Sequence, residues 1–298
     1  MKTLEAMKLG TRLLRSYLFA PGNHLRKVEK VFQVGADAVI LDLEDAVAVA
    51  EKEVSRETVV EAMKKPRNCL GYIRVNGLDT EFSLGDFQAV VGDWLDGIVV
   101  PKVENAGDLQ TADWILTNLE KERGLEVGSI DLLPIIETGL GIQNVEEIAN
   151  SGTRVKRLSF GAGDFTRDMG MIWSPNEDEL SYARSRMVLA SRNANIESPI
   201  DTVFIDLEDE EHLQKSAQAG AYFGFQGKLC IHPKQIAAVH AAFTPTAKQI
   251  KRAAKIVQAF KEAEEQGSAS IQVDGYFVDY PIVEKAMRVL EIAKSLPG

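Results

Sequence analysis

The segment from Ala38 to Asp45 reads Ala-Val-Ile-Leu-Asp-Leu-Glu-Asp, a short apolar run that changes abruptly into acidic residues. An apolar run of this length is typical of a buried strand, and Val54–Lys64 further on has the spacing of an amphipathic helix. The same alternation recurs along the chain and gives eight βα units. The predicted strands are Ser16–Phe19, Ala38–Leu43, Tyr72–Val75, Gly97–Pro101, Leu132–Ile136, Arg157–Phe160, Thr202–Ile205 and Lys228–Ile231.

Eight successive βα units favour an α/β fold of the closed (β/α)8 type, the TIM barrel, over an open doubly wound sheet. After the eighth unit come a long helical pattern, a short stretch of β character and a last helical pattern. We therefore expect an N-terminal extension at residues 1–13, a barrel at residues 14–245 and a C-terminal helical extension at residues 246–298.

The composition excludes several classes of function. The 298 residues are 45% hydrophobic and 26% charged, and no apolar run is long enough to span a bilayer, so we expect no membrane role. The formal net charge of −10 and the scattered basic residues argue against a nucleic-acid partner. The cysteines, Cys69 and Cys230, lack the paired spacing of a zinc site and are interpreted as reduced thiols, which suits a cytoplasmic enzyme.

Charged residues follow most of the predicted strands, at the end of a barrel where active sites form. Carboxylates outnumber the cations that could pair with them, and crowded carboxylates repel unless a cation binds among them. Because these ligands are oxygens, Mg²⁺ or Mn²⁺ is favoured over zinc. We select Glu137 and Asp164 as the metal ligands, since each stands at a strand end beside glycines. The alternative is that these acids cap the following helices.

Two further patterns have simpler interpretations. Gly161-Ala162-Gly163 follows a strand, but Thr166 stands where a dinucleotide-binding fingerprint would place its third glycine. The acidic run that begins at Ile205 resembles the one at Leu41, which similar βα junctions explain better than duplication does. We expect Asp209 in this run to cap a helix.

A series of motifs in order resembles the citrate lyase beta-subunit-like family within the HpcH/HpaI aldolase and citrate lyase superfamily. The motifs are Arg15–Gly22, Ile40–Ala46, Ile73–Gly77, Val100–Val103, Ile135–Gly141, Gly161–Phe165 and Ile231–Gln235. The resemblance implies a (β/α)8 barrel that binds Mg²⁺ through Glu137 and Asp164. It also implies substrate binding by Arg15, Pro21, Glu44, Asp45, Arg74 and Lys102, with Arg15 and Pro21 near the thioester carrier.

The C-terminal segment Asp274–Pro281 matches a further motif of free-standing lyases in this family, in which an acid serves the active site of a neighbouring subunit. Here that acid is Asp279, and the resemblance implies that it and Arg74 are catalytic. Phe277 replaces the usual methionine of this motif, and Gly163 stands where relatives often have an acid just before the metal ligand.

The resemblance implies a magnesium-dependent carbon–carbon lyase that cleaves or forms a 3-hydroxyacyl-CoA thioester, giving a 2-oxo acid and an acyl-CoA. (S)-Citramalyl-CoA is the favoured substrate, yielding pyruvate and acetyl-CoA. The alternatives are a malyl-CoA lyase or thioesterase, the beta subunit of a citrate lyase complex acting on a citryl thioester, and a non-catalytic binding protein. The expected assembly is a homo-oligomer, a trimer or hexamer, and Asp279 favours the free-standing enzyme over the subunit.

Overall fold

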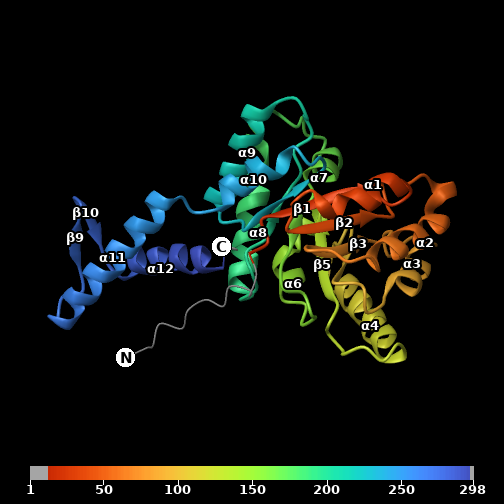
Figure 1. Cartoon of the computed structure of the whole chain (residues 1–298), viewed down its shortest axis with the longest axis horizontal. Coiled ribbons are helices and arrows are strands. Elements are labelled where there is room, and N and C mark those ends of the chain that lie inside the picture. The colour runs from red at the N-terminus through yellow and green to blue at the C-terminus, as the bar shows by residue number, and fades with distance from the viewer. Residues whose placement is uncertain (1–12, 296–298) are drawn as a thin grey trace. The chain divides into compact units, whose positions relative to one another are not determined.

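The computed structural model describes residues 13–295, which fall into two compact units (Figure 1). The barrel unit comprises residues 14–240, and the C-terminal unit begins at Ala241. Helices surround a closed sheet in the first unit, whereas two long helices pack with a small hairpin in the second.

Among the described residues, eight parallel strands form a closed sheet in which each strand pairs with the next and β8 pairs with β1. This closure confirms the predicted (β/α)8 barrel. The strands are β1 (Ser16–Pro21), β2 (Ala38–Asp42), β3 (Leu70–Arg74), β4 (Gly97–Val100), β5 (Asp131–Ile136), β6 (Ser159–Phe160), β7 (Ile200–Asp201) and β8 (Gly227–Cys230).

The helices of the barrel layer follow the strands in chain order. They are α1 (Leu25–Lys30), α2 (Lys52–Met63), α3 (Ser83–Val90), α4 (Ala106–Glu122), α5 (Gly139–Gln143), α6 (Val145–Ala149), α7 (Ala162–Asp168), α8 (Ser181–Asn193), α9 (Glu210–Phe223) and α10 (Gln235–Phe243). Asp209 accepts a hydrogen bond from the His212 amide at 3.0 Å, which confirms its predicted role as the cap of α9. The sequence did not predict α5 and α7, because their short glycine-containing segments carry no clear helical period.

The alternation of side chains along the strands explains how the barrel core leads into a polar mouth. Side chains of a strand point alternately to its two faces, and those facing inward fill the barrel. Counting two residues onward from core members on β2, β3 and β5 reaches Asp42, Arg74 and Glu137. The core cluster includes Tyr17, Ala38, Ile40, Tyr72, Val99, Leu133, Ile135, Ile200 and Leu229.

The prediction for the seventh strand is wrong, because β7 is Ile200–Asp201 and not Thr202–Ile205. Asp201 is fully buried between the sheet and the helix layer. It accepts hydrogen bonds from Arg184 on α8 and Lys228 on β8, each at 3.0 Å. A buried strand is recognised in a sequence by its apolar run, and the charged Asp201 interrupts that run. The sequence pattern therefore predicted the strand at the residues that follow.

The C-terminal unit contains α11 (Ala247–Glu265), the antiparallel pair β9 (Ile271–Val273) and β10 (Tyr276–Val278), and α12 (Tyr280–Lys294). These elements agree with the helix, β and helix order expected from the sequence. Their apolar faces enclose a small core of their own, formed by Ala253, Ile256, Phe260, Val273, Val278, Val283 and Ala286.

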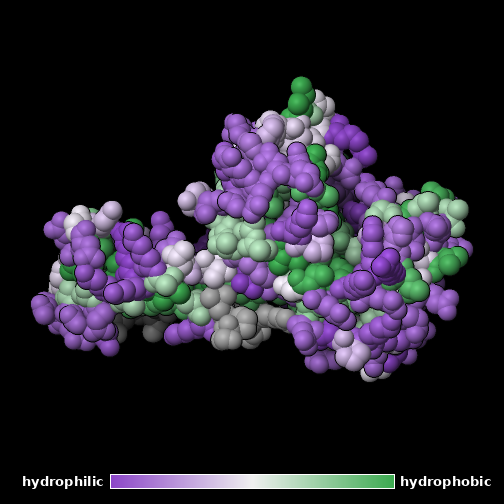
Figure 2. Space-filling view, turned by 45° about the horizontal axis from the view of Figure 1, so that its top comes forward, coloured by the Kyte–Doolittle hydropathy of each residue, from purple (hydrophilic) through white to green (hydrophobic). Residues whose placement is uncertain are grey.

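The surface is largely polar. Hydrophilic residues dominate the face in Figure 2, and hydrophobic side chains appear between them in patches. Exposed aromatic residues occur on β10, where the Arg252 guanidinium lies 4.2 Å from the centre of the Tyr276 ring and Phe277 is also exposed. None of the described helices is both long and apolar enough to cross a membrane.

Candidate active site

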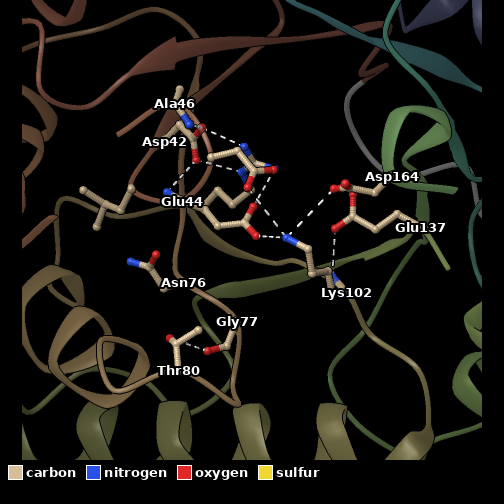
Figure 3. A network of polar contacts seen from close by, with 12 residues as sticks. Asp42, Glu44, Ala46, Asn76, Gly77, Thr80, Lys102, Glu137 and Asp164 are labelled. Atoms are coloured by element: carbon tan, nitrogen blue, oxygen red, sulfur yellow. Dashed lines mark hydrogen bonds and ion pairs between the residues drawn. The ribbon is translucent and has the colours of Figure 1, made fainter. Parts of the chain in front are cut away.

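The charged side chains that follow several strands meet at the carboxyl end of the barrel, as Figure 3 shows. Asp42 ends β2 and Arg74 ends β3, and the register of the two strands pairs these residues directly. Lys102 follows β4, Glu137 follows β5 and Asp164 lies in the first turn of α7. The structure therefore brings together five of the predicted site residues: Glu44, Arg74, Lys102, Glu137 and Asp164. Asp45 joins them at the rim, 3.7 Å from both Arg74 and Lys102.

Arg74 is held firmly by carboxylates before any ligand binds. Its Nε and Nη2 atoms each donate to Asp42 at 2.7 Å, and Nη1 lies 2.8 Å from Glu44 Oε2. Burial opposes ionisation, but the Arg74 guanidinium outweighs it and holds the pKa of Asp42 below its usual range. Asp42 was absent from the predicted site, although its position opposite Arg74 on a neighbouring strand is the signal that could have revealed it.

Lys102 contacts acids on both sides of the mouth. Its backbone conformation, with φ at 52°, is uncommon for a non-glycine residue. Its amide donates to Glu137 Oε1 at 2.8 Å, while its ammonium donates to Glu44. The same ammonium lies 3.9 Å from Asp164. Burial lowers the pKa of the lysine, but Glu44 and the other acids raise it above the usual value, so Lys102 is a permanent cation here.

Glu137 lies at the bottom of the mouth and is only 4% exposed. Burial, reinforced by the charges of Glu44 and Asp164, raises the pKa of Glu137 to about 8, although Arg74 opposes this shift. Asp164 is more open and pairs with Arg167 on its own helix at 2.8 Å. The pair therefore combines a buried, poorly stabilised carboxylate with an accessible one.

The charge balance at the mouth fits a divalent cation. Within the described part of the chain, five carboxylates meet three cations there: Asp42, Glu44, Asp45, Glu137 and Asp164 against Arg74, Lys102 and Arg167. No group of three His, Cys, Asp or Glu residues in that part is arranged to hold a metal. Mg²⁺ needs only one or two protein carboxylates and keeps water or substrate oxygens as its other ligands, so Glu137 and Asp164 suit it.

A second buried network supports the acidic loop after β2. The Lys52 ammonium donates to the backbone carbonyls of Leu43 and Glu44 and to the side chain of Asn76, at 2.6–3.1 Å. Asn76 in turn donates from its backbone and its side chain to Asp86. The sequence signalled only Asn76, within a motif at a strand end, because Lys52 and Asp86 lie outside the recognised motifs.

Two predicted site residues have local partners of their own. Arg15 precedes β1 at its amino end, where it pairs with Asp37 at 2.9 Å, whereas Pro21 ends the same strand beside Asp42. The first motif thus spans a whole strand, and Arg15 lies at the end of the barrel opposite the mouth. Asp279 belongs to the C-terminal unit, where its side chain caps α12 by accepting from the Ile282 amide at 3.4 Å.

Comparisons with known proteins agree with this geometry. A family model described as HpcH/HpaI aldolase/citrate lyase matches residues 15–233. The citrate lyase subunit beta of Leuconostoc mesenteroides subsp. cremoris is 39% identical over 95% of this chain and 94% of its own. The L-malyl-CoA/beta-methylmalyl-CoA lyase of Rhodobacter capsulatus is 34% identical over 95% and 96%.

Among solved structures, CitE of Mycobacterium tuberculosis in complex with magnesium, acetoacetate and coenzyme A superimposes with a TM-score of 0.78. It is 27% identical over 96% of this chain and 100% of its own. Fold, mouth and relatives together define a (β/α)8-barrel enzyme of the carbon–carbon lyase class. The chain belongs to the HpcH/HpaI aldolase/citrate lyase family, which confirms the resemblance found in its motifs.

Proposed function

We propose that this enzyme is a magnesium-dependent lyase that cleaves or forms a 3-hydroxyacyl-CoA thioester, releasing a 2-oxo acid and an acyl-CoA. The observation that carries the proposal is the pair Glu137 and Asp164 at a mouth with excess negative charge. The related CitE structure, whose complex contains magnesium, an oxo acid and coenzyme A, supports the same ligand set.

Glu137 and Asp164 would hold the Mg²⁺, which when bound supplies a Lewis acid for the oxygens of the oxo-acid half. Arg74 presents one guanidinium edge at the mouth, since Asp42 occupies the other. That edge would bind the substrate carboxylate or the developing negative charge. Glu44, which contacts the same edge in this structure, would either move away from it or stay beside the ligand. Lys102 would keep Glu44 and Asp45 in place and add positive charge beside the reacting carbons.

When the carbinol hydroxyl loses its proton and the bond from the carbinol carbon to the α-carbon breaks, the electron pair stays on the α-carbon as the enolate of the acyl thioester, which must then gain a proton. We propose Asp279 of a neighbouring subunit as the acid, and as the base for the reverse direction. Its support is the family motif and its position at a helix start, half-exposed on a separately folded unit. This proposal requires a homo-oligomer, for which we propose a trimer or a hexamer.

The acyl group is proposed as (S)-citramalyl, with malyl-CoA as the nearest alternative. A citryl thioester is a second candidate, because the citrate lyase beta subunit quoted above is 39% identical whereas the malyl-CoA lyase is 34% identical. The match to that subunit covers 95% of this chain, so it extends through Asp279. The presence of the C-terminal segment therefore does not separate a free-standing lyase from a subunit.

The direct test assays the purified protein with citramalyl-CoA, malyl-CoA and citryl-CoA, with and without Mg²⁺, and separates the products chromatographically. We expect turnover of at least one CoA ester that disappears on chelation, with citramalyl-CoA cleaved fastest. Turnover of none of them would overturn the free-standing lyase. Faster cleavage of citryl-CoA would replace citramalyl as the proposed acyl group.

Two variants test the residue roles. Glu137→Gln should raise the Mg²⁺ requirement sharply, whereas Glu126→Gln, at an exposed glutamate before β5, should not. Asp279→Asn should abolish turnover while the thioester still binds. Unchanged Mg²⁺ dependence in the first variant, or unchanged turnover in the second, would remove that residue from the mechanism.

A further inference from the structure

The helix that carries Asp164 has no cap from its own chain segment. The N-cap position of α7 is Gly161, which has no side chain to accept from the first amides. The acceptor comes from the residue that follows the next strand along the chain. Thr202, which directly follows β7, accepts a hydrogen bond through Oγ1 from the Ala162 amide at 2.8 Å. Thr202 and Ala162 are both fully buried.

The same turn is fixed to the other metal ligand. Gly161 donates its amide to the Ile136 carbonyl at 3.0 Å, one residue before Glu137. A methyl group added to Gly161 would lie 2.7 Å from Glu137 Cβ, so the glycine backbone packs directly on this side chain. The turn between β6 and α7 is therefore held against Glu137 on one side and by the Thr202 hydroxyl on the other.

Thr202 is held in position by the motif that follows β8, Ile231–Gln235. This motif has no other role in the proposed reaction. Gln235 Nε2 donates to the Phe204 carbonyl at 2.8 Å, and its Oε1 accepts from the Ile231 amide at 2.8 Å. One buried side chain thus ties the loop after β7 to the loop after β8. This tie holds the segment that contains Thr202.

We propose that Thr202 is a positioning residue for the metal site, which sets the distance between Glu137 and Asp164 by capping α7. This inference rests on the proposed role of these two acids as Mg²⁺ ligands. Groups that orient metal ligands without touching the metal typically change metal affinity by about 10–100-fold when they are removed. The hydrogen bond of Thr202 goes to the Ala162 amide and not to either carboxylate, so its effect would pass through the turn at Gly161.

Isothermal titration of the full-length, substrate-free protein with MgCl₂ tests the inference. Thr202→Val keeps the shape and removes the acceptor, so we expect the Kd for Mg²⁺ to rise about tenfold. Thr202→Ser keeps the hydroxyl and should stay within about twofold of the wild type. The matched control is Thr166→Val, which removes a hydroxyl on α7 that donates to the Ala162 carbonyl at 2.8 Å, and it should leave the Kd unchanged.

The outcomes separate a positioning role from a purely structural one. A Thr202→Val protein that melts at a lower temperature but binds Mg²⁺ as tightly as the wild type overturns the inference and leaves the proposed function standing. A wild-type protein that binds no Mg²⁺ overturns both. If Thr202→Val does not fold, Thr202→Ala replaces it with the same expected loss, and an unchanged Kd in that variant is equally decisive.

Discussion

Replacing Arg74 by Met is expected to destabilise the barrel strongly, because the arginine is the partner of two buried acids. Asp42 is 1% exposed and Glu44 is 6% exposed, and Arg74 contacts them at 2.7 and 2.8 Å. Removing one partner of a buried ion pair typically costs about 3–5 kcal/mol. In a domain of about 150–250 residues each kcal/mol lowers Tm by about 2–4 °C, so we expect a fall of about 6–20 °C.

Urea unfolding of Arg74→Met, Asp42→Asn and the double variant measures the interaction directly. We expect the double variant to lose about 2 kcal/mol less than the sum of the single losses, because each single change strands the other charge. Arg74 lowers the pKa of Asp42, so the Asp42 contribution is present above about pH 4 and is lost as the pH falls through its folded-state value. The gap between wild type and Arg74→Met should therefore narrow in acid.

The control is Arg26→Met, which removes an exposed arginine of α1 and should change Tm very little. Strict additivity in the cycle would refute the pairing of Asp42 with Arg74. An Arg74→Met protein with the same Tm as the wild type would also refute this pairing.

Three further predictions concern the metal site and the buried charges. The pKa of Glu137 is raised to about 8, and Mg²⁺ needs the carboxylate form of this residue. The apparent Mg²⁺ affinity should therefore rise about tenfold per pH unit up to pH 8 and then level off. Calorimetry that shows no dependence of the affinity on pH would contradict this prediction. Gly161→Ala should weaken Mg²⁺ binding because its methyl group would displace Glu137. Gly163→Ala, whose methyl group would meet Trp173 at an ordinary contact distance of 3.7 Å, should bind normally in the same titration. Asp201→Asn should lower the free energy of unfolding by about 3–5 kcal/mol, because it leaves the buried Lys228 without its carboxylate partner and Arg184 with Glu177 alone. An unchanged thermal melt would show that the pairing is not needed.

The barrel and most of its mouth could be predicted because both depend on local sequence. Most of the strands are short apolar runs, and the charged residues that follow them lie at the carboxyl end of the barrel. Glu137 and Asp164 were selected from their positions at strand ends, whereas the roles of Glu44, Arg74 and Lys102 came from the family resemblance; the structure brings all five together.

The errors arose where the decisive partner is distant in the sequence. The seventh strand was displaced because Asp201 looks polar until Arg184 and Lys228 are placed beside it. Asp42 was overlooked as a site residue because its importance depends on the register between β2 and β3. The amino-end position of Arg15 could not be predicted, because a motif gives residue order but not which end of a strand each residue occupies.

The locked geometry of Arg74 also affects the entropy of binding. Long charged side chains usually lose about 0.5–1.5 kcal/mol of rotamer freedom when a ligand immobilises them. The fork held by Asp42, with the ring of Phe19 at 5.0 Å from the guanidinium carbon, has already removed that freedom during folding. A ligand that reaches the edge of Arg74 that Asp42 does not hold therefore meets a rigid cation. The entropy of ordering this side chain is lost on folding and not on binding.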